Sequence, residues 1–141
     1  MTRTKKTAPR ARSGRLVVLG AIGLVSVTLA ATPAFAKSSA DISAQRTAHV
    51  GETYRVTGQG NDDAAPLLRV CIENRTGGAA WQQISCGSLV TAGTDAQNVT
   101  QIKAARTGIV EYRAVVYGLT GPTDGHPVRE RTSDTATVSV R

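Results

Sequence analysis

The segment VEYRAVVY, residues 110–117, decides the fold class of this chain. Its residues form two alternating sets: Val110, Tyr112, Ala114 and Val116 against Glu111, Arg113, Val115 and Tyr117. Successive side chains of a β-strand point to opposite faces of the sheet. The alternation therefore predicts a strand with one face in a core.

The same short alternating pattern recurs after Lys37, and turn residues separate the segments. We expect further strands at residues 42–47, 53–57, 67–73, 81–86, 99–104 and 135–140. No stretch in this part has the apolar period of an amphipathic helix, which a parallel sheet would need for its crossovers. Residues 41–141 are therefore expected to form one all-β domain, an antiparallel β-sandwich of about seven strands. Residues 37–40 are expected to be a flexible mature N-terminus.

The segments between these strands are predicted to be irregular. Residues 58–63 and 87–95 are polar and contain glycine, which is typical of connections. Residues 118–133 contain three glycines and two prolines, and we expect a long irregular loop there.

Residues 1–36 have the three parts of a secretory signal peptide. The positive part precedes residue 16, and residues 16–31 are an uncharged apolar run. Ala34 and Ala36 are the small residues that flank a signal-peptidase site, with cleavage before Lys37. An apolar run of 16 residues is shorter than the roughly 20 that a helix needs to cross a bilayer. The sequence predicts a secreted, extracellular protein with no stable membrane insertion after cleavage.

The positive charge of the chain belongs to this targeting segment. The whole chain has a net charge of +7, which by itself would favour a nucleic-acid partner. Six of the 17 Lys and Arg residues lie in residues 1–36, which leaves 11 against all 10 Asp and Glu, a net charge of +1. We therefore expect no nucleic-acid binding.

Cys71 and Cys86 both lie in the exported part, and the chain has no other cysteine. An even number of cysteines in an oxidising compartment favours a disulfide. A metal pair would need further ligands at a recognised spacing, which the sequence lacks. We expect one disulfide between Cys71 and Cys86.

A hairpin that pairs the two cysteines has its turn beside residues 77–78, two glycines for which left-handed backbone is cheap. That register places Val70 and Ile72 on the same face as Trp81 and Ser85, and Trp81 is expected to fill the core. A one-residue bulge would reverse the facing and leave the pairing of the cysteines intact.

Several stretches carry a resemblance to a known class of domain. They are residues 51–56, the strand that ends in Cys71, Trp81 in its partner strand, the turn at 106–108 before residues 112–116, and the closing segment 133–138. Together they resemble the immunoglobulin-like domains of secreted bacterial proteins of actinobacterial type. The resemblance implies an immunoglobulin-like sandwich over residues 41–141, with Tyr112 as a tyrosine-corner residue. The inter-sheet disulfide common in that family is missing, because the two cysteines suit a local hairpin.

No catalytic constellation is recognisable. His49 and His126 are the only histidines, and neither belongs to a nucleophile signature, so we expect no enzymatic activity. The stretch Asn61, Asp62 and Asp63 offers oxygen atoms for calcium, but the recognised calcium loop is missing and these residues are ordinary in turns. No metal and no cofactor are expected.

The leading functional hypothesis is a secreted, non-enzymatic binding or structural module that presents loops to an extracellular protein or glycan. Within the loop 118–133 we expect the contact residues to be His126, Arg129, Glu130 and Arg131, because loops on rigid scaffolds often carry recognition. One alternative is a small-molecule carrier, since the chain resembles secreted chromoprotein apoproteins in size, export and hairpin cysteines. Another is a secreted enzyme inhibitor.

Overall fold

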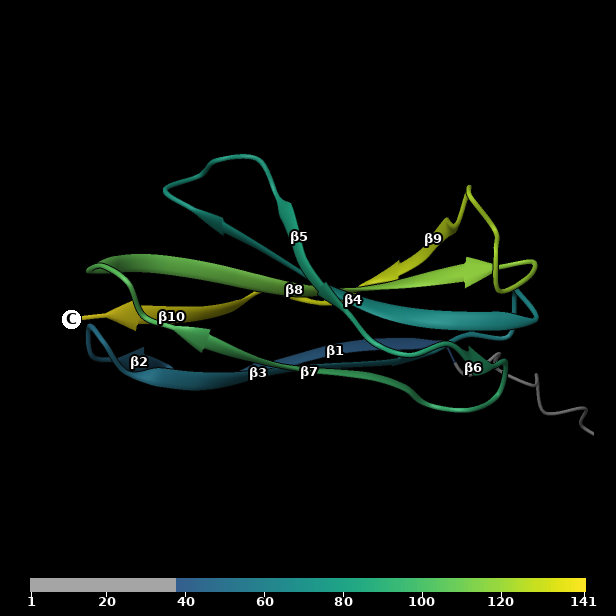
Figure 1. Ribbon diagram of the computed structural model, residues 1–141, viewed down its shortest axis with the longest axis horizontal. Helices are drawn as coiled ribbons and strands as arrows, with labels where there is room; N and C mark the ends of the chain where they lie inside the picture. Colours follow the sequence, from purple (N-terminus) through teal and green to yellow (C-terminus); the bar gives the residue numbers. More distant parts are fainter. Residues whose placement is uncertain (1–37) are drawn as a thin grey trace, which may run out of the picture. The chain divides into compact units, whose positions relative to one another are not determined.

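The computed structural model describes residues 38–141 (Figure 1). The predicted signal peptide and its cleavage site at Ala34, Ala36 and Lys37 lie outside the described residues. The strands are β1 (Ser39–Ala44), β2 (Thr47–Ala48), β3 (Thr53–Asn61), β4 (Leu67–Thr76), β5 (Gln82–Cys86), β6 (Val90–Thr91), β7 (Ala96–Lys103), β8 (Gly108–Leu119), β9 (Val128–Thr132) and β10 (Ala136–Val140). Across residues 38–141 no helix has the length and hydropathy needed to span a membrane.

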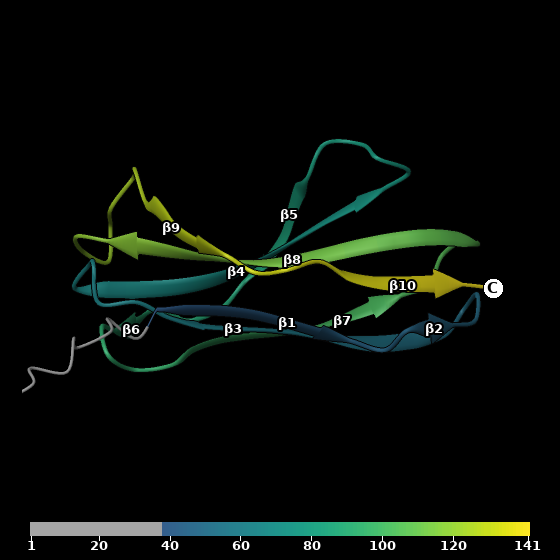
Figure 2. The ribbon, with the colours of Figure 1, turned by 180° about the vertical axis from the view of Figure 1, so that it is seen from behind.

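The strands form two sheets that pack face to face (Figures 1 and 2). The smaller sheet has the order β1-β3-β7, and the larger has the order β2-β10-β8-β4-β5, with β6 paired to β4 and β9 to β8. All pairings are antiparallel except β10 with β2. The expected all-β sandwich is confirmed at the level of two packed sheets.

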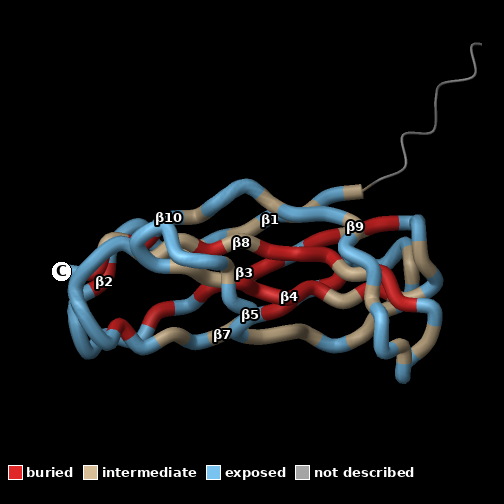
Figure 3. Tube along the Cα trace, turned by 90° about the horizontal axis from the view of Figure 1, so that it is seen from above, coloured by how far each residue is buried: buried red, intermediate tan, exposed pale blue. Residues whose placement is uncertain are grey.

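The core lies between the sheets, along β3, β4 and β8 (Figure 3). In the segment 110–117, Tyr112, Ala114 and Val116 of the apolar set face inward and are all buried. Tyr112 meets Tyr54 of β3, and their hydroxyl oxygens lie 2.6 Å apart. Tyr112 thus bonds to a side chain of the opposite sheet, where the resemblance implied a tyrosine corner.

Besides the connection expected at 87–95, which contains the short strand β6, two predicted loops turn out to contain strand. Residues 58–61 continue β3, where the prediction ended the strand at 57. Their glycines serve close packing: a Cβ on Gly58 would lie 3.1 Å from Ala114 Cβ, and one on Gly60 would lie 2.8 Å from the Ser39 carbonyl oxygen. Glycine in a strand marks close approach as well as a turn, and local sequence does not separate the two.

The long loop expected at 118–133 is the other correction. Residues 128–132 form β9, which pairs with β8 from Val115 to Gly118, with a register shift between Val116 and Tyr117. The irregular part is therefore confined to residues between β8 and β9. The short strands β2 and β6 were also not expected from the sequence.

The β4–β5 hairpin confirms the cysteine pairing and corrects the facing of Trp81. Cys71 pairs with Cys86 and the two are joined by a disulfide. Ile72 still pairs with Ser85, but the register shifts between Ile72 and Glu73. Trp81 consequently sits opposite the outward side of β4, in contact with Arg75, and does not share the core face of Val70 and Ile72.

Candidate functional site

The side of the larger sheet that faces away from the smaller sheet, here called the outer face, carries a dense polar cluster. Along β4 and β8 the outward residues alternate with the core residues and pair across the strands as Arg69–Tyr117, Cys71–Val115, Glu73–Arg113 and Arg75–Glu111. Alternation on a pleated sheet is what gathers these side chains on one face.

Two flanking elements rise on this side of the sheet. The β4–β5 hairpin and β9 both stand above β8, on the side away from β3 and β7 (Figures 1 and 2). Cys71 and Val115 on the outer face have no exposed surface. The middle of the face is thus covered, and the polar side chains surround that covered centre.

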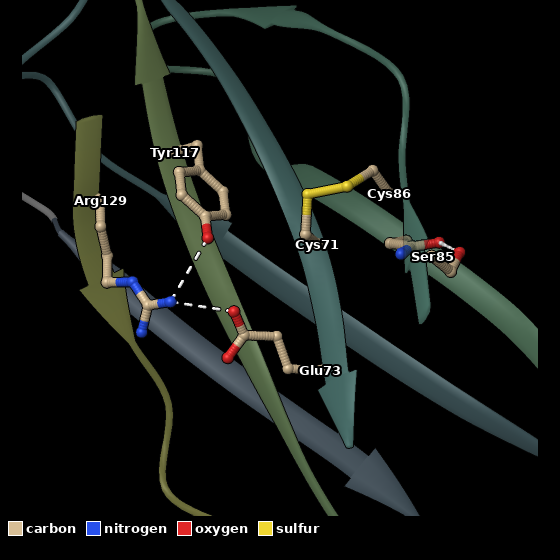
Figure 4. Close-up of a disulfide and its surroundings, with 7 residues drawn as sticks. Cys71, Glu73, Ser85, Cys86, Tyr117 and Arg129 are labelled. Carbon is tan, nitrogen blue, oxygen red and sulfur yellow. Dashed lines mark hydrogen bonds and ion pairs between the residues drawn. A yellow bond between two sulfur atoms is a disulfide. The ribbon is translucent and has the colours of Figure 1, made fainter. Parts of the chain in front are cut away.

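Glu73 links three strands of this face. Its side chain is only 7% exposed, and its carboxylate lies 2.6 Å from Arg113 Nη2 and 2.9 Å from Arg129 Nη2. The Arg129 Nη2 atom is also 3.4 Å from the Tyr117 hydroxyl (Figure 4). The nearly buried carboxylate of β4 is therefore neutralised by one arginine from β8 and one from β9.

Trp81, the only tryptophan of the chain, lies against two guanidinium groups. The Cζ atoms of Arg75 and Arg113 are 4.5 and 4.2 Å from the centre of its ring. Arg75 also bonds to Glu111 through two nitrogen atoms, at 2.7 and 3.3 Å. This hydrogen bonding raises the pKa of Arg75 and lowers the pKa of Glu111, so the pair stays charged. The indole is held against a fixed pair of cations, an attractive geometry.

The outer face has an excess of positive charge. Four arginines, Arg69, Arg75, Arg113 and Arg129, stand against two carboxylates, Glu73 and Glu111, which leaves +2. The Arg69 Nε atom is buried and has no hydrogen-bond partner. The face is suited to polar or anionic groups, with Trp81 and Tyr117 as its aromatic side chains.

The four loop residues predicted from the sequence lie in different surroundings, and two of them, Glu130 and Arg131, line the same hollow. Arg129 belongs to the outer face, whereas Arg131 Nε lies 3.5 Å from Asp62 Oδ2 in the connection between β3 and β4. Glu130 lies against Gly118, because a Cβ on that glycine would be 2.6 Å from Glu130 Oε1. His126 is exposed at the loop, and its backbone N–H donates to Asp124.

Sequence reasoning missed most of the outer face. It named Arg129 but not Glu73, Arg75 or Arg113, and it expected Trp81 in the core. The available signal was the polar set of each strand: the charged residues of β4 and β8 fall at every second position, which marks one polar face. The hairpin register, which brings Trp81 to the same face, had no such signal.

Of the residues that offer oxygen atoms for calcium, Asn61 and Asp62 take part in hydrogen bonds, and the Asn61 Oδ1 atom itself is buried without a hydrogen-bond partner. Asn61 donates to Asp95 at 2.9 Å, and Asp62 accepts from the Ala64 backbone N–H at 2.8 Å. Asp62, Asp63, Glu130 and Arg131 line a hollow of about 360 Å³ together with Ser38 and Ala64. Within the described part of the chain no three His, Cys, Asp or Glu side chains are grouped so that they could hold a metal ion.

No protein-family model matches the chain, and no curated protein matches it either.

Proposed function

We propose that this protein is a secreted, non-enzymatic binding module, an immunoglobulin-like sandwich that uses its outer face to bind an extracellular glycan or protein. The observation that carries the proposal is Trp81, held outside the core against Arg75 and Arg113. An indole that served only stability would gain more from burial in the core, since aromatic side chains dominate core energetics.

The surroundings of Trp81 suit a polar ligand with flat apolar faces. A sugar ring offers such a face for stacking, and its hydroxyl groups can bond to the carboxylates and guanidinium groups of Glu111, Arg75 and Arg113. Because these groups are already fixed by their mutual bonds, they lose little conformational freedom when a ligand binds. Trp and Arg are also the residues enriched at protein-binding hot spots, so a protein partner is the second form of the same proposal.

Trp81 provides its own assay. Because it is the only tryptophan, the tryptophan fluorescence of the secreted protein reports on this face alone. Titration with extracellular polysaccharides is expected to change the emission saturably for a cognate glycan. The variant Trp81→Ala is expected to lose retention on that glycan, and the charge variant Arg55→Gln, on exposed β3 surface, is expected to keep it. Retention by Trp81→Ala equal to that of the unchanged protein would refute the proposed binding face.

The carrier alternative is favoured by hollows at one end of the sandwich. Native mass spectrometry of protein purified from its own culture medium separates the candidates. A co-purifying small molecule favours a carrier, whereas a co-purifying protein favours the binding module or an enzyme inhibitor.

A further inference from the structure

Three hollows meet at the end of the sandwich where β4 and β7 finish. Their volumes are about 140, 370 and 230 Å³, and Thr76 and Arg106 line all three. The first lies between the sheets, the second lies beside the β7–β8 turn, and the third adjoins the β4–β5 hairpin at Ala79 and Ala80. Arg106 and Thr76 are therefore shared by three neighbouring hollows.

The inner hollow has an apolar wall. Among its lining residues are Ile102, Ala104, Val110 and Val140, of which Ala104 and Val140 are nearly fully buried. A dry apolar cavity of about 150 Å³ is large enough to bind benzene. The inner hollow, at about 140 Å³, has the size for one aromatic ring or a branched apolar group.

The same hollow ends at a polar floor formed by the buried hydroxyl groups of Tyr54 and Tyr112. Only one of the two hydroxyl protons can lie between the oxygens. The other hydroxyl proton therefore points away from the pair and can be donated to a neighbouring acceptor.

The charge around the three hollows has one sign. Lys103, Arg106 and Arg75 are the charged residues that line them, and no Asp or Glu does. Among residues 38–141 the ion pairs include Arg75 but not Arg106 or Lys103. A cation without a partner at the mouth of an apolar hollow complements an anion with an apolar body.

We propose that this end of the sandwich binds a small amphipathic organic anion, with its carboxylate on Arg106 and its apolar group in the hollow that ends at Tyr54 and Tyr112. The site does not use Trp81, and of its lining residues Arg75, in the third hollow, also belongs to the outer face. The ligand class is an aromatic or branched carboxylic acid in its ionised form.

A matched pair of probes tests the proposal by isothermal titration calorimetry of the secreted protein: 3-phenylpropionate, and 3-phenylpropan-1-ol, which keeps the ring and lacks the charge. We expect saturable binding of the acid and at least about tenfold weaker binding of the alcohol, because a hydrogen bond to a charged group is lost. Arg106→Gln is expected to weaken binding of the acid by a similar factor, and Arg106→Lys is expected to weaken it by less. The Arg55→Gln variant is the charge control and is expected to bind normally.

Location is tested with Thr76→Phe, which places a ring at a position that lines all three hollows, and with Trp81→Ala. We expect Thr76→Phe to abolish binding of the acid while its melting temperature shows that it is folded, and Trp81→Ala to bind as the unchanged protein does. Should Thr76→Phe not fold, amide chemical-shift changes on adding the acid are expected at residues 103–108. Equal affinities for acid and alcohol, normal binding by Arg106→Gln, shifts confined to the outer face, or no saturable binding of 3-phenylpropionate would each overturn the proposal. Loss of glycan binding by Trp81→Ala with normal acid binding separates this site from the outer face.

Discussion

Glu73 is the residue on which the geometry of the outer face depends. A carboxylate that is 7% exposed is costly to bury unless it is paired. Arg113 and Arg129 provide the pairing from β8 and β9, so a single side chain fixes the positions of two strands relative to β4. Arg113 in turn supports Trp81, which connects the buried charge to the proposed binding surface.

Replacing Glu73 with glutamine is expected to destabilise the fold by about 2–4 kcal/mol, because both arginines lose the charge that compensates them. Equilibrium unfolding in urea measures this. Glu111→Gln, which removes the same charge from the more exposed pair with Arg75, is expected to have a smaller effect. Equal losses for the two variants would contradict the central role of Glu73.

At the scale of elements, the β4–β5 hairpin is weakly held by its own pairing. Only Cys71, Ile72, Glu73 and Asn74 of β4 pair with β5, and a register shift interrupts them. Residues 82–84 of β5 are exposed. The disulfide at the base of the hairpin therefore constrains an element that packing alone holds loosely.

The double variant Cys71→Ser with Cys86→Ser is expected to lower the free energy of unfolding by about 2–4 kcal/mol, chiefly because the unfolded chain is released from a cross-link. At about 4–8 °C per kcal/mol, the melting temperature should fall by about 8–30 °C. Calorimetry measures the fall. Because Cys71 is fully buried, the pair Cys71→Ala with Cys86→Ala controls for the cost of burying a serine hydroxyl group there. A melting temperature unchanged in both pairs would show that packing alone holds the hairpin.

The connection between β8 and β9 is organised by Asp124. Its carboxylate accepts from the Thr120 backbone N–H and hydroxyl and from the His126 backbone N–H. These bonds lower the pKa of Asp124 below its ordinary value of 3.8, with the backbone bond from Thr120 the largest cause. A group with a lowered pKa in the folded state stabilises that state above its unfolded pKa, and the contribution is lost as the pH falls through the folded value.

We therefore expect the amide resonances of Thr120 and His126 to titrate together, with a midpoint below pH 3.8. Amide NMR spectra recorded across this pH range provide the measurement. The variant Asp124→Asn is expected to remove the titration at both amides. A midpoint above 3.8 would mean that the carboxylate is not held by these donors.

At the scale of the whole molecule, the proposed export and the disulfide bear on the same question, the redox state of the compartment. A disulfide persists in oxidising compartments, and the Cys71–Cys86 bond is present in the folded domain. The net charge expected after removal of residues 1–36 is only +1, so the outer face, at +2, is a local positive surface on a nearly neutral protein. Such a surface favours approach of an anionic partner.

The intact mass of protein from the culture medium is expected to correspond to a chain that starts at Lys37 and lacks two hydrogens relative to the reduced form. Replacing Ala36 with leucine is expected to prevent or move cleavage, because the site requires small residues. Free thiols at both cysteines would contradict the oxidised state, and a doubled mass on non-reducing analysis would indicate a covalent dimer.

Local alternation determined the fold class and the position of most strands, and the presence of only two cysteines determined the pairing of Cys71 with Cys86. These features depend on the period of apolar residues along a single strand and on the number of cysteines, neither of which requires the tertiary structure. The same alternation contained the polar set of β4 and β8, so the sequence could have predicted that Glu73 and Arg113 lie on a polar face.

Only the tertiary structure decided which residues of other strands lie beside Glu73 and Arg113. One register shift in the β4–β5 hairpin moves Trp81 from the core to the outer face, and another in β9 separates Arg129 from Arg131. Gly60 lies in a strand because the Ser39 backbone passes beside it, not because of its own sequence context. A bulge changes the facing of every residue beyond it and is selected by packing between strands far apart in the chain, so the local pattern holds no record of it.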